Sequence, residues 1–267
     1  MTPGSRSARI QALVAEQAAL RGARVGVLDV CTAAVAALPV GGAGMSAMSR
    51  DRASHPLCST DSVSQHLEEL QLTLGEGPSV DAYVLGSTVL CPDLLAGQLQ
   101  RHWTVFADAA LEAGARAVFA FPLQIGAVSP GVLDLYSSSS VELDAEEVAD
   151  AMAFADAATL ILLDARISET GVPFDTHTPG TDQPDTAPFD DLGGYRAEID
   201  QATGILMVQL DVGFEEAFIR LRAHAYARGT RISAVAADVI AHRLRLPPDT
   251  APSDIRPPEA RPPDEES

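Results

Sequence analysis

Two unusually small residues stand in the middle of a predicted helix near the C-terminus of the sequence. Ala202 and Gly204 lie within residues 199–207, an amphipathic stretch whose apolar stripe includes Ile199 and Leu206. Glycine inside a helix costs roughly 1 kcal/mol relative to alanine. We therefore expect another backbone to approach this helix closely. That backbone belongs either to a binding partner or to a neighbouring helix of the same chain.

This segment is the first of three amphipathic helices predicted between residues 192 and 246. The second begins at Phe214, carries acids in its first turn, where they suit the helix dipole, and ends at Gly229. A unit of this size is marginal alone, so we expect it to dimerise or to dock on the rest of the chain. The expected inner faces are Tyr195, Ile199, Ala202, Leu206 and Leu210, then Phe214, Ala217, Phe218, Leu221 and Ala225, then Ile232, Val235, Ala236, Val239 and Ile240.

The preceding block, residues 10–166, mixes helix and strand signals and predicts an α+β domain with a central antiparallel sheet and flanking helices. A long helix is expected after Asp144. Its predicted inner face is Val148, Met152, Ala155, Thr159 and Leu162. The other expected helices cover residues 28–38, 63–74 and 103–113, and the expected strands cover residues 43–48, 117–121 and 131–136, the last two as a hairpin.

Two segments lack any hydrophobic period. Residues 167–191 are rich in Gly, Pro, Thr and Asp and are predicted to be a flexible linker. Residues 247–267 form an acidic, proline-rich tail that has too little apolar surface to order itself. The chain therefore divides into a first domain, a linker, a three-helix unit and a tail.

Net charge weighs against general affinity for nucleic acids. The chain carries −19, and such a surface repels phosphates. The charge is unevenly distributed, because residues 1–191 hold 9 arginines and 25 acidic residues, whereas residues 192–246 hold 7 arginines and 6 acidic residues, a net charge of +1. So small a positive excess makes DNA binding by the three helices unattractive.

Few residues have the types and spacing of a catalytic or metal site. Cys31, Cys58 and Cys91 are widely spaced, and we expect reduced, mostly buried thiols in a cytoplasmic protein. The histidines lack metal-ligand spacing, and the sequence has no nucleophile elbow, no HExxH motif and no phosphate-binding glycine loop. The sequence has no run of about 18 apolar residues, so no membrane-spanning helix is predicted. We expect no enzyme activity, no metal and no cofactor.

Four short motifs mark the first block: Gly42-Ala43-Gly44, Gly75-Glu76-Gly77-Pro78, Phe121-Pro122-Leu123, and Gly131-Val132-Leu133-Asp134-Leu135-Tyr136. Together they resemble a GAF domain, the small-molecule-sensing fold of many bacterial regulators. The resemblance implies a sensor that responds to an unidentified small molecule or protein signal. Many relatives carry cysteine after the Gly-Glu-Gly-Pro motif, where this chain has Ser79.

A longer series runs through the three C-terminal helices: Ile199, Gln201-Ala202, Gly204, Leu206-Met207, Glu216-Ala217-Phe218, Leu221-Arg222, Ala225, Val235-Ala236 and Val239. Its order and spacing resemble ANTAR domains, the RNA-binding output modules of bacterial transcription antiterminators. A GAF-like sensor joined to such a unit is typical of actinobacterial antitermination regulators. The resemblance implies recognition of paired RNA stem-loops in nascent transcripts, which prevents a terminator from forming.

The resemblance and the residue types define a candidate RNA-binding set: Gln201, Ala202, Thr203, Gly204, Arg222, Ala225, Tyr226, Arg228 and Arg231. The small residues would leave little side-chain bulk on the first helix, so that RNA could approach its backbone closely. The arginines could meet phosphates or stack on bases, and Tyr226 could add a stacking surface. The family usually has lysine where this chain has Thr203, whose hydroxyl can donate one hydrogen bond to phosphate or sugar.

Structural roles for the same residues stay open. Gly204 would equally serve close helix packing, Arg222 would equally pair with Glu215 or Glu216, and Tyr226 would equally lie at the edge of the core.

The expected function is antitermination by a homodimeric regulator, in which a signal at the sensor changes exposure or dimerisation of the helical unit. The alternative is a protein-interaction or dimerisation regulator that lost RNA binding when the family's lysine became Thr203.

Overall fold

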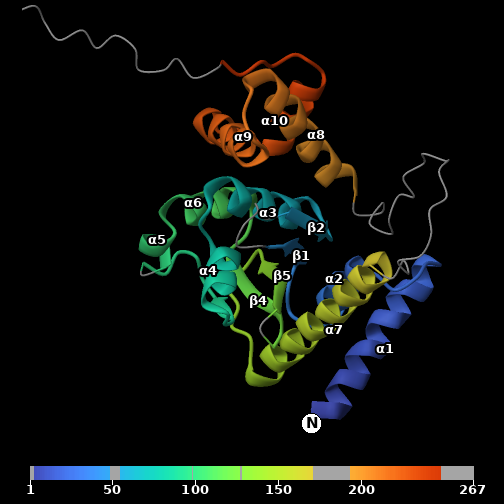
Figure 1. Ribbon diagram of the computed structural model, residues 1–267. Coiled ribbons are helices and arrows are strands. Elements are labelled where there is room, and N and C mark those ends of the chain that lie inside the picture. Colours follow the sequence, from blue (N-terminus) through green and yellow to red (C-terminus); the bar gives the residue numbers. More distant parts are fainter. Residues whose placement is uncertain (1–2, 49–54, 98, 127, 171–192, 248–267) are drawn as a thin grey trace, which may run out of the picture.

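The computed structural model describes residues 3–48, 55–97, 99–126, 128–170 and 193–247. Within these ranges a first domain, made of helices around an antiparallel sheet, is followed by a unit of three helices (Figure 1). The predicted α+β fold class with a C-terminal three-helix unit is confirmed. Residues 167–170 of the predicted linker are helical, which corrects that boundary, whereas residues 171–191 of the linker and residues 248–267 of the predicted tail lie outside the described residues.

One five-stranded antiparallel sheet organises the first domain, in the order β2-β1-β5-β4-β3. The strands are β1 (Gly42–Ala47), β2 (His55–Ser59), β3 (Val89–Cys91), β4 (Ala117–Ile125) and β5 (Val128–Ser137). The predicted hairpin corresponds to β4 and β5, which pair in antiparallel register. The edge strands β2 and β3 are too short to leave a periodic signal, and the sequence pattern does not predict them.

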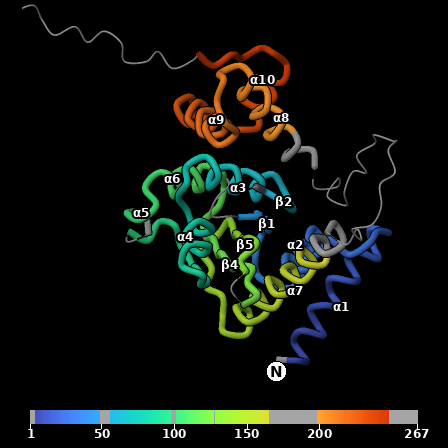
Figure 2. Tube along the Cα trace, in the orientation of Figure 1, coloured from blue at the N-terminus to red at the C-terminus, as the bar shows by residue number. Residues whose placement is uncertain are grey.

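Helices cover both faces of the sheet (Figures 1 and 2). On one face lie α2 (Val27–Ala37) and α7 (Ala145–Thr170), with α1 (Pro3–Arg21) packed against both. Alternate residues of β4 serve the two sides, because Phe119 and Phe121 join the core beneath α2 and α7, while Val118 and Ala120 face the opposite side. Burial on both faces explains why β4 has a continuous apolar run instead of an alternating one.

The opposite face is covered by α3 (Ser62–Leu74) and α4 (Pro78–Leu85). Beside α3 lies α6 (Thr104–Ala113), preceded by the short helix α5 (Leu99–His102). Trp103 and Phe106 are buried in the cluster between these helices and the sheet.

The inner face predicted for the long helix α7 needs correction. Asp144 caps this helix as predicted, since its carboxylate accepts hydrogen bonds from the backbone of Glu146 and Glu147, each 2.8 Å long. Met152, however, is 52% exposed, whereas Phe154 is completely buried. The true inner stripe is rich in alanine, and small residues give a weak periodic signal. That stripe is Ala151, Phe154, Ala155, Ala158 and Leu162, and the predicted Thr159 and Val148 also lie on this side, Thr159 completely buried and Val148 packed against the core.

Three helices form the C-terminal unit: α8 (Gly193–Leu210), α9 (Phe214–Arg228) and α10 (Ile232–Ile240). Their inner faces agree with the predicted stripes, except that Phe214 is 40% exposed and the side chain of Tyr195 lies outside the described residues. Gly229 ends α9 in a left-handed conformation, as predicted. The apolar core of the unit includes Leu72 of α3, so the unit docks on the first domain.

Among the described residues, no helix combines the length and apolar character needed to cross a membrane.

Candidate nucleic-acid interface

The first helix of the unit turns two of its candidate residues inward. Ala202 and Thr203 are completely buried. The Thr203 hydroxyl donates a 2.7 Å hydrogen bond to the carbonyl oxygen of Ile199, one turn earlier in α8. A hydroxyl in this position has no contact with solvent. The expectation that Thr203 faces a phosphate is therefore corrected for this arrangement of the chain.

Gly204, unlike Ala202 and Thr203, lies beside open space. A Cβ atom placed on Gly204 would meet no atom within 4 Å, apart from its own helix and chain neighbours, so close helix packing is not the reason for this glycine. It lines a groove of about 560 Å³ between α8, α10 and the residues after α10. We call this the α8–α10 groove, and its lining includes Gln201, Gly204, Val208, Val239, His242 and Arg245.

Helix α9 divides its candidate residues between core and surface. Ala225 is completely buried in the core of the unit, so it supports the helix packing and offers no exposed surface. Tyr226 is 57% exposed and Arg228 is exposed, which leaves an aromatic ring and a cation on the surface of the same helix turn. An exposed ring beside a cation is suited to base stacking and phosphate contact.

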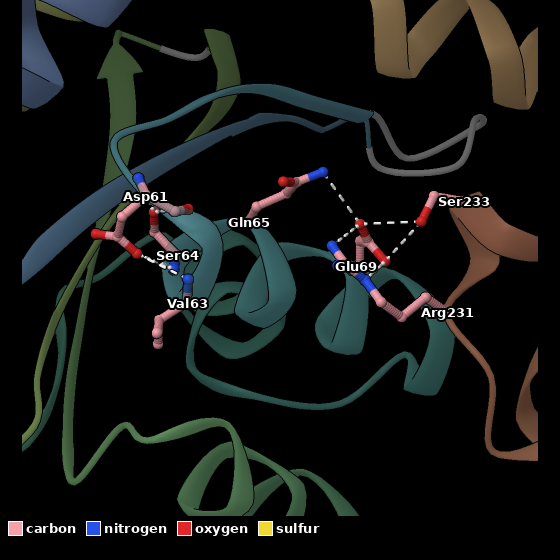
Figure 3. Close-up of polar contacts among 7 residues, drawn as sticks. All are labelled: Asp61, Val63, Ser64, Gln65, Glu69, Arg231 and Ser233. Atoms are coloured by element: carbon pink, nitrogen blue, oxygen red, sulfur yellow. Dashed lines mark hydrogen bonds and ion pairs between the residues drawn. The ribbon is translucent and has the colours of Figure 1, made fainter.

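Arg231, immediately before α10, binds the first domain while 40% of its side chain stays exposed. Its guanidinium donates two hydrogen bonds to the Glu69 carboxylate of α3, from Nε to Oε2 at 2.8 Å and from Nη2 to Oε1 at 2.6 Å (Figure 3). The Ser233 hydroxyl donates to the same carboxylate at 3.2 and 3.3 Å, and the Gln65 amide donates at 3.4 Å. The Glu69 side chain is only 2% exposed, so these donors replace the water that its charge would otherwise require.

Arg222 is also turned toward α3. Its Nη2 atom lies 3.0 Å from the position that a Cβ on Gly75 would take, at the C-terminal end of that helix. Burial lowers the pKa of the guanidinium from its usual value. The predicted pairing with Glu215 or Glu216 is not what the structure brings together, because Glu216 pairs with Arg220 at 2.7 Å.

The helix that receives these arginines is firmly placed. Asp61 caps the start of α3 by accepting 2.8 Å hydrogen bonds from the backbone of Val63 and Ser64 (Figure 3). Between α3 and α6 on one side and α9 on the other lies a cavity of about 630 Å³, lined among others by Glu69, Tyr226 and Arg231. Tyr226 therefore stands at the rim of the boundary between the two domains.

The inward side of α3 carries a second acidic group. Glu68 is buried beneath the sheet, where it hydrogen-bonds Ser46 of β1, and Asp134 of β5 lies beside it with Ser79. Gly44 allows this approach, because a Cβ there would collide with the Glu68 carboxylate. Burial raises the pKa of Glu68 well above its usual value and raises that of Asp134 to about 6. Burial therefore favours the protonated form of both carboxyl groups relative to carboxyls in water.

Some residues near the candidate surface escape sequence reasoning. Arg245 and His242 line the α8–α10 groove from the segment that follows α10, outside the period of any helix. Only the folded arrangement brings them beside Gly204. Within the described part of the chain, no group of three or more His, Cys, Asp or Glu side chains is placed to hold a metal ion.

Residues 195–240 match the family of the ANTAR domain, which agrees with the three helices that the structure places there. The series of residues recognised in the sequence is therefore confirmed as an ANTAR domain. No curated protein matches the chain.

Solved structures similar to the chain include GAF domains. The GAF domain of a phosphoenolpyruvate-protein phosphotransferase from Coxiella burnetii is 14% identical, and the match covers 61% of this chain and 98% of that chain with a TM-score of 0.46. The corresponding domain from Acinetobacter is 11% identical, with 62% of this chain and 95% of that chain covered and a TM-score of 0.44.

Replacing Gly204 by alanine is expected to stabilise the protein. The added methyl meets no neighbour, and alanine lowers the conformational cost of the helix by about 0.5–1 kcal/mol. Urea unfolding followed by circular dichroism measures this change. Loss of stability in Gly204→Ala would show that the position is tightly packed after all, with Gly213→Ala as a comparison at another open glycine outside a helix interior.

Stability is expected to fall as the pH rises through the titration of Asp134. The folded-state pKa of about 6 lies above the ordinary value near 4, so ionisation favours the unfolded chain. This contribution is complete below about pH 4 and is lost above about pH 6, which corresponds to roughly 2–3 kcal/mol. Burial shifts Glu68 in the same direction.

The variant Asp134→Asn isolates this effect, because it keeps the shape of the side chain and removes its charge. Relative to wild type, it should be more stable at about pH 8, and the gain should shrink toward about pH 5 in urea unfolding. Glu16→Gln, an exposed position on α1, is the control. An equal effect of Asp134→Asn at both pH values would contradict the assignment.

Proposed function

We propose that the protein is a signal-responsive transcription antitermination regulator, which binds RNA stem-loops through the ANTAR domain under the control of a GAF-like sensor domain. The observation that carries the proposal is the match of residues 195–240 to the ANTAR family. The exposed Tyr226 and Arg228 and the open surface at Gly204 support it, because they offer stacking, charge and close approach.

The proposed control by the sensor rests on the contacts that α3 makes with two arginines of the C-terminal unit. Arg231 is bound to Glu69 and Arg222 is half-buried over the end of α3, so two of the candidate cations face the first domain. RNA phosphate and the Glu69 carboxylate are both anions and would compete for Arg231. In our proposal the docked arrangement binds RNA weakly, and a signal that moves α3 increases the population of an undocked, binding-competent arrangement.

Tandem RNA hairpins provide the direct test. We expect purified full-length protein to bind an RNA with two hairpins more tightly than a scrambled RNA of equal length, in fluorescence anisotropy at low salt. Arg228→Ala should weaken binding and reduce the slope of affinity against salt by about one unit, since it removes one phosphate contact. Gly204→Glu should weaken binding by placing a negative charge on the open surface.

The controls separate binding from folding. Arg243→Ala alters an exposed arginine that is paired with Asp238 and is not among the candidate residues, and it should leave affinity nearly unchanged. Unfolding curves of each variant show whether the unit is intact. Absence of any preference for hairpins would overturn the RNA proposal, and a tight dimer in solution together with that absence would support the interaction or dimerisation alternative.

Release of Arg231 is expected to strengthen RNA binding. Glu69→Gln keeps the size of the side chain but removes the charge that holds the guanidinium, and a charge-assisted pair whose arginine is 40% exposed is worth about 1–2 kcal/mol. The affinity for the hairpin RNA should therefore rise roughly tenfold. Arg231→Ala frees the same surface but removes a cation, so its affinity should stay below that of Glu69→Gln.

Glu142→Gln, an exposed acid of the first domain, controls for the change in net charge. An affinity of Glu69→Gln equal to that of Glu142→Gln would mean that docking on α3 does not limit RNA binding.

A further inference from the structure

Two cysteines that are distant in the sequence meet in the first domain. The Sγ atoms of Cys31 on α2 and Cys58 on β2 lie 3.2 Å apart, although 27 positions separate the residues. Cys31 is completely buried, whereas Cys58 is partly exposed at the edge of the sheet. The pair therefore combines one thiol within reach of solvent with one interior thiol directly behind it.

An irregularity in β2 explains how Cys58 reaches α2. The pairing with β1 joins Met45 to Cys58 and then Ser46 to Pro56, so the register passes over Leu57. An extra residue in one strand redirects neighbouring side chains. As a result both Leu57 and Cys58 pack against the core beneath α2, where a regular strand would send one of them to the other face.

The distance is short enough for covalent pairing with little movement. A disulfide bond is about 2.05 Å long, so the two sulfur atoms need to approach by about 1.2 Å. Cys58 lies on an edge strand, which has a neighbouring strand on one side only and can adjust more easily than a central strand. The third cysteine, Cys91, is buried in a different cluster, between the sheet and α6.

We propose that Cys31 and Cys58 form a redox-modification site, at which a low-molecular-weight disulfide such as oxidised glutathione converts the two thiols into an intramolecular disulfide. The Cys58 thiolate attacks one sulfur of the oxidant and releases one glutathione thiolate. The Cys31 sulfur then attacks Cys58 and releases the second glutathione. The two cysteine protons end on the two glutathione molecules, and the two electrons that the cysteine sulfurs lose reduce the disulfide bond of the oxidant.

The environment assigns these roles to the two thiols. Cys58 is the only one of the pair that an oxidant can reach from solvent. The hydrogen bond with Cys58 and burial together hold the pKa of Cys31 well above its usual range, so Cys31 is the less reactive thiol of the pair toward an oxidant in solution. A disulfide formed in this way is reversible by thiols, as regulatory disulfides inside cells are.

The cross-link would join parts of the molecule that meet near the domain boundary. Strand β2 contacts α2 on one side, and it also contacts α3 and α8. Oxidation would therefore fix the edge strand against α2 beside the helix that carries Glu69. The proposal about the cysteines does not depend on the RNA-binding function.

Mass spectrometry of the full-length protein tests the proposal. Folded protein is incubated with oxidised glutathione, and its remaining thiols are then alkylated under denaturing conditions. We expect two of the three cysteines to be protected, the intact mass to fall by two hydrogen atoms before alkylation, and a Cys31–Cys58 peptide to appear on digestion. Reduction should restore all three thiols.

Single substitutions identify the order of the two steps. Cys31→Ser should stop the reaction at a glutathione adduct on Cys58, because no second thiol resolves it. Cys58→Ser should prevent both adduct and disulfide, and Cys91→Ser should react like wild type. Circular dichroism before oxidation shows which variants are folded.

The wild-type digest alone can overturn the proposal, whatever the variants do. Three alkylatable thiols after treatment of the folded protein, a persistent glutathione adduct without a cross-link, or a disulfide that includes Cys91 would each contradict it.

Discussion

Two adjacent glutamates of α3 are buried in different directions, and the arrangement of the molecule depends on how each carboxyl group is satisfied. Glu68 lies beneath the sheet with Ser46 and Asp134, where burial favours its protonated form. Glu69 points out of the first domain and is held by Arg231 and Ser233 of the C-terminal unit. A buried carboxylate without such partners would be costly, so Glu69 ties the two domains together. Glu68 and Glu69 are consecutive residues of α3. A shift of Glu68 beneath the sheet would therefore also move Glu69 at the domain boundary.

The uneven distribution of charge has a structural counterpart in this contact. The acidic first domain receives arginines of the nearly neutral C-terminal unit, and Leu72 of α3 completes the apolar core of that unit. A three-helix unit buries too little apolar surface to be strongly stable by itself. Docking therefore adds apolar burial and ionic pairing at once, and it occupies cations that an RNA phosphate would otherwise attract. Stability of the unit and availability of its surface are opposed in this arrangement.

Much of the fold could be predicted from the sequence because most of its helices and strands carry apolar residues at regular spacing. The stripes of α8, α9 and α10 and the hairpin of β4 and β5 have clear periods, and the capping residues Asp144 and Gly229 mark helix ends directly. The inner face of α7 was misplaced at Met152, since a stripe of alanines contrasts weakly with its neighbours. The candidate site was less predictable, because contacts such as Arg231 with Glu69 join residues 162 positions apart. No local pattern encodes the partner of an arginine, or the meeting of Cys31 with Cys58.

Thr203 acquires a different meaning from its surroundings than from its place in the sequence series. Compared with the lysine usual in the family, it first suggests a lost phosphate contact. In the folded chain it is completely buried and its hydroxyl is satisfied within α8, so it is part of the packing. A lysine in that position would bring an ammonium group into the interior, unless its long side chain reached the surface or the helices moved apart. Threonine thus fits the packing around α8 without bringing a charge into it. In the proposed function, RNA binding would depend on the cations of α9 and of the segment before α10, two of which face the first domain.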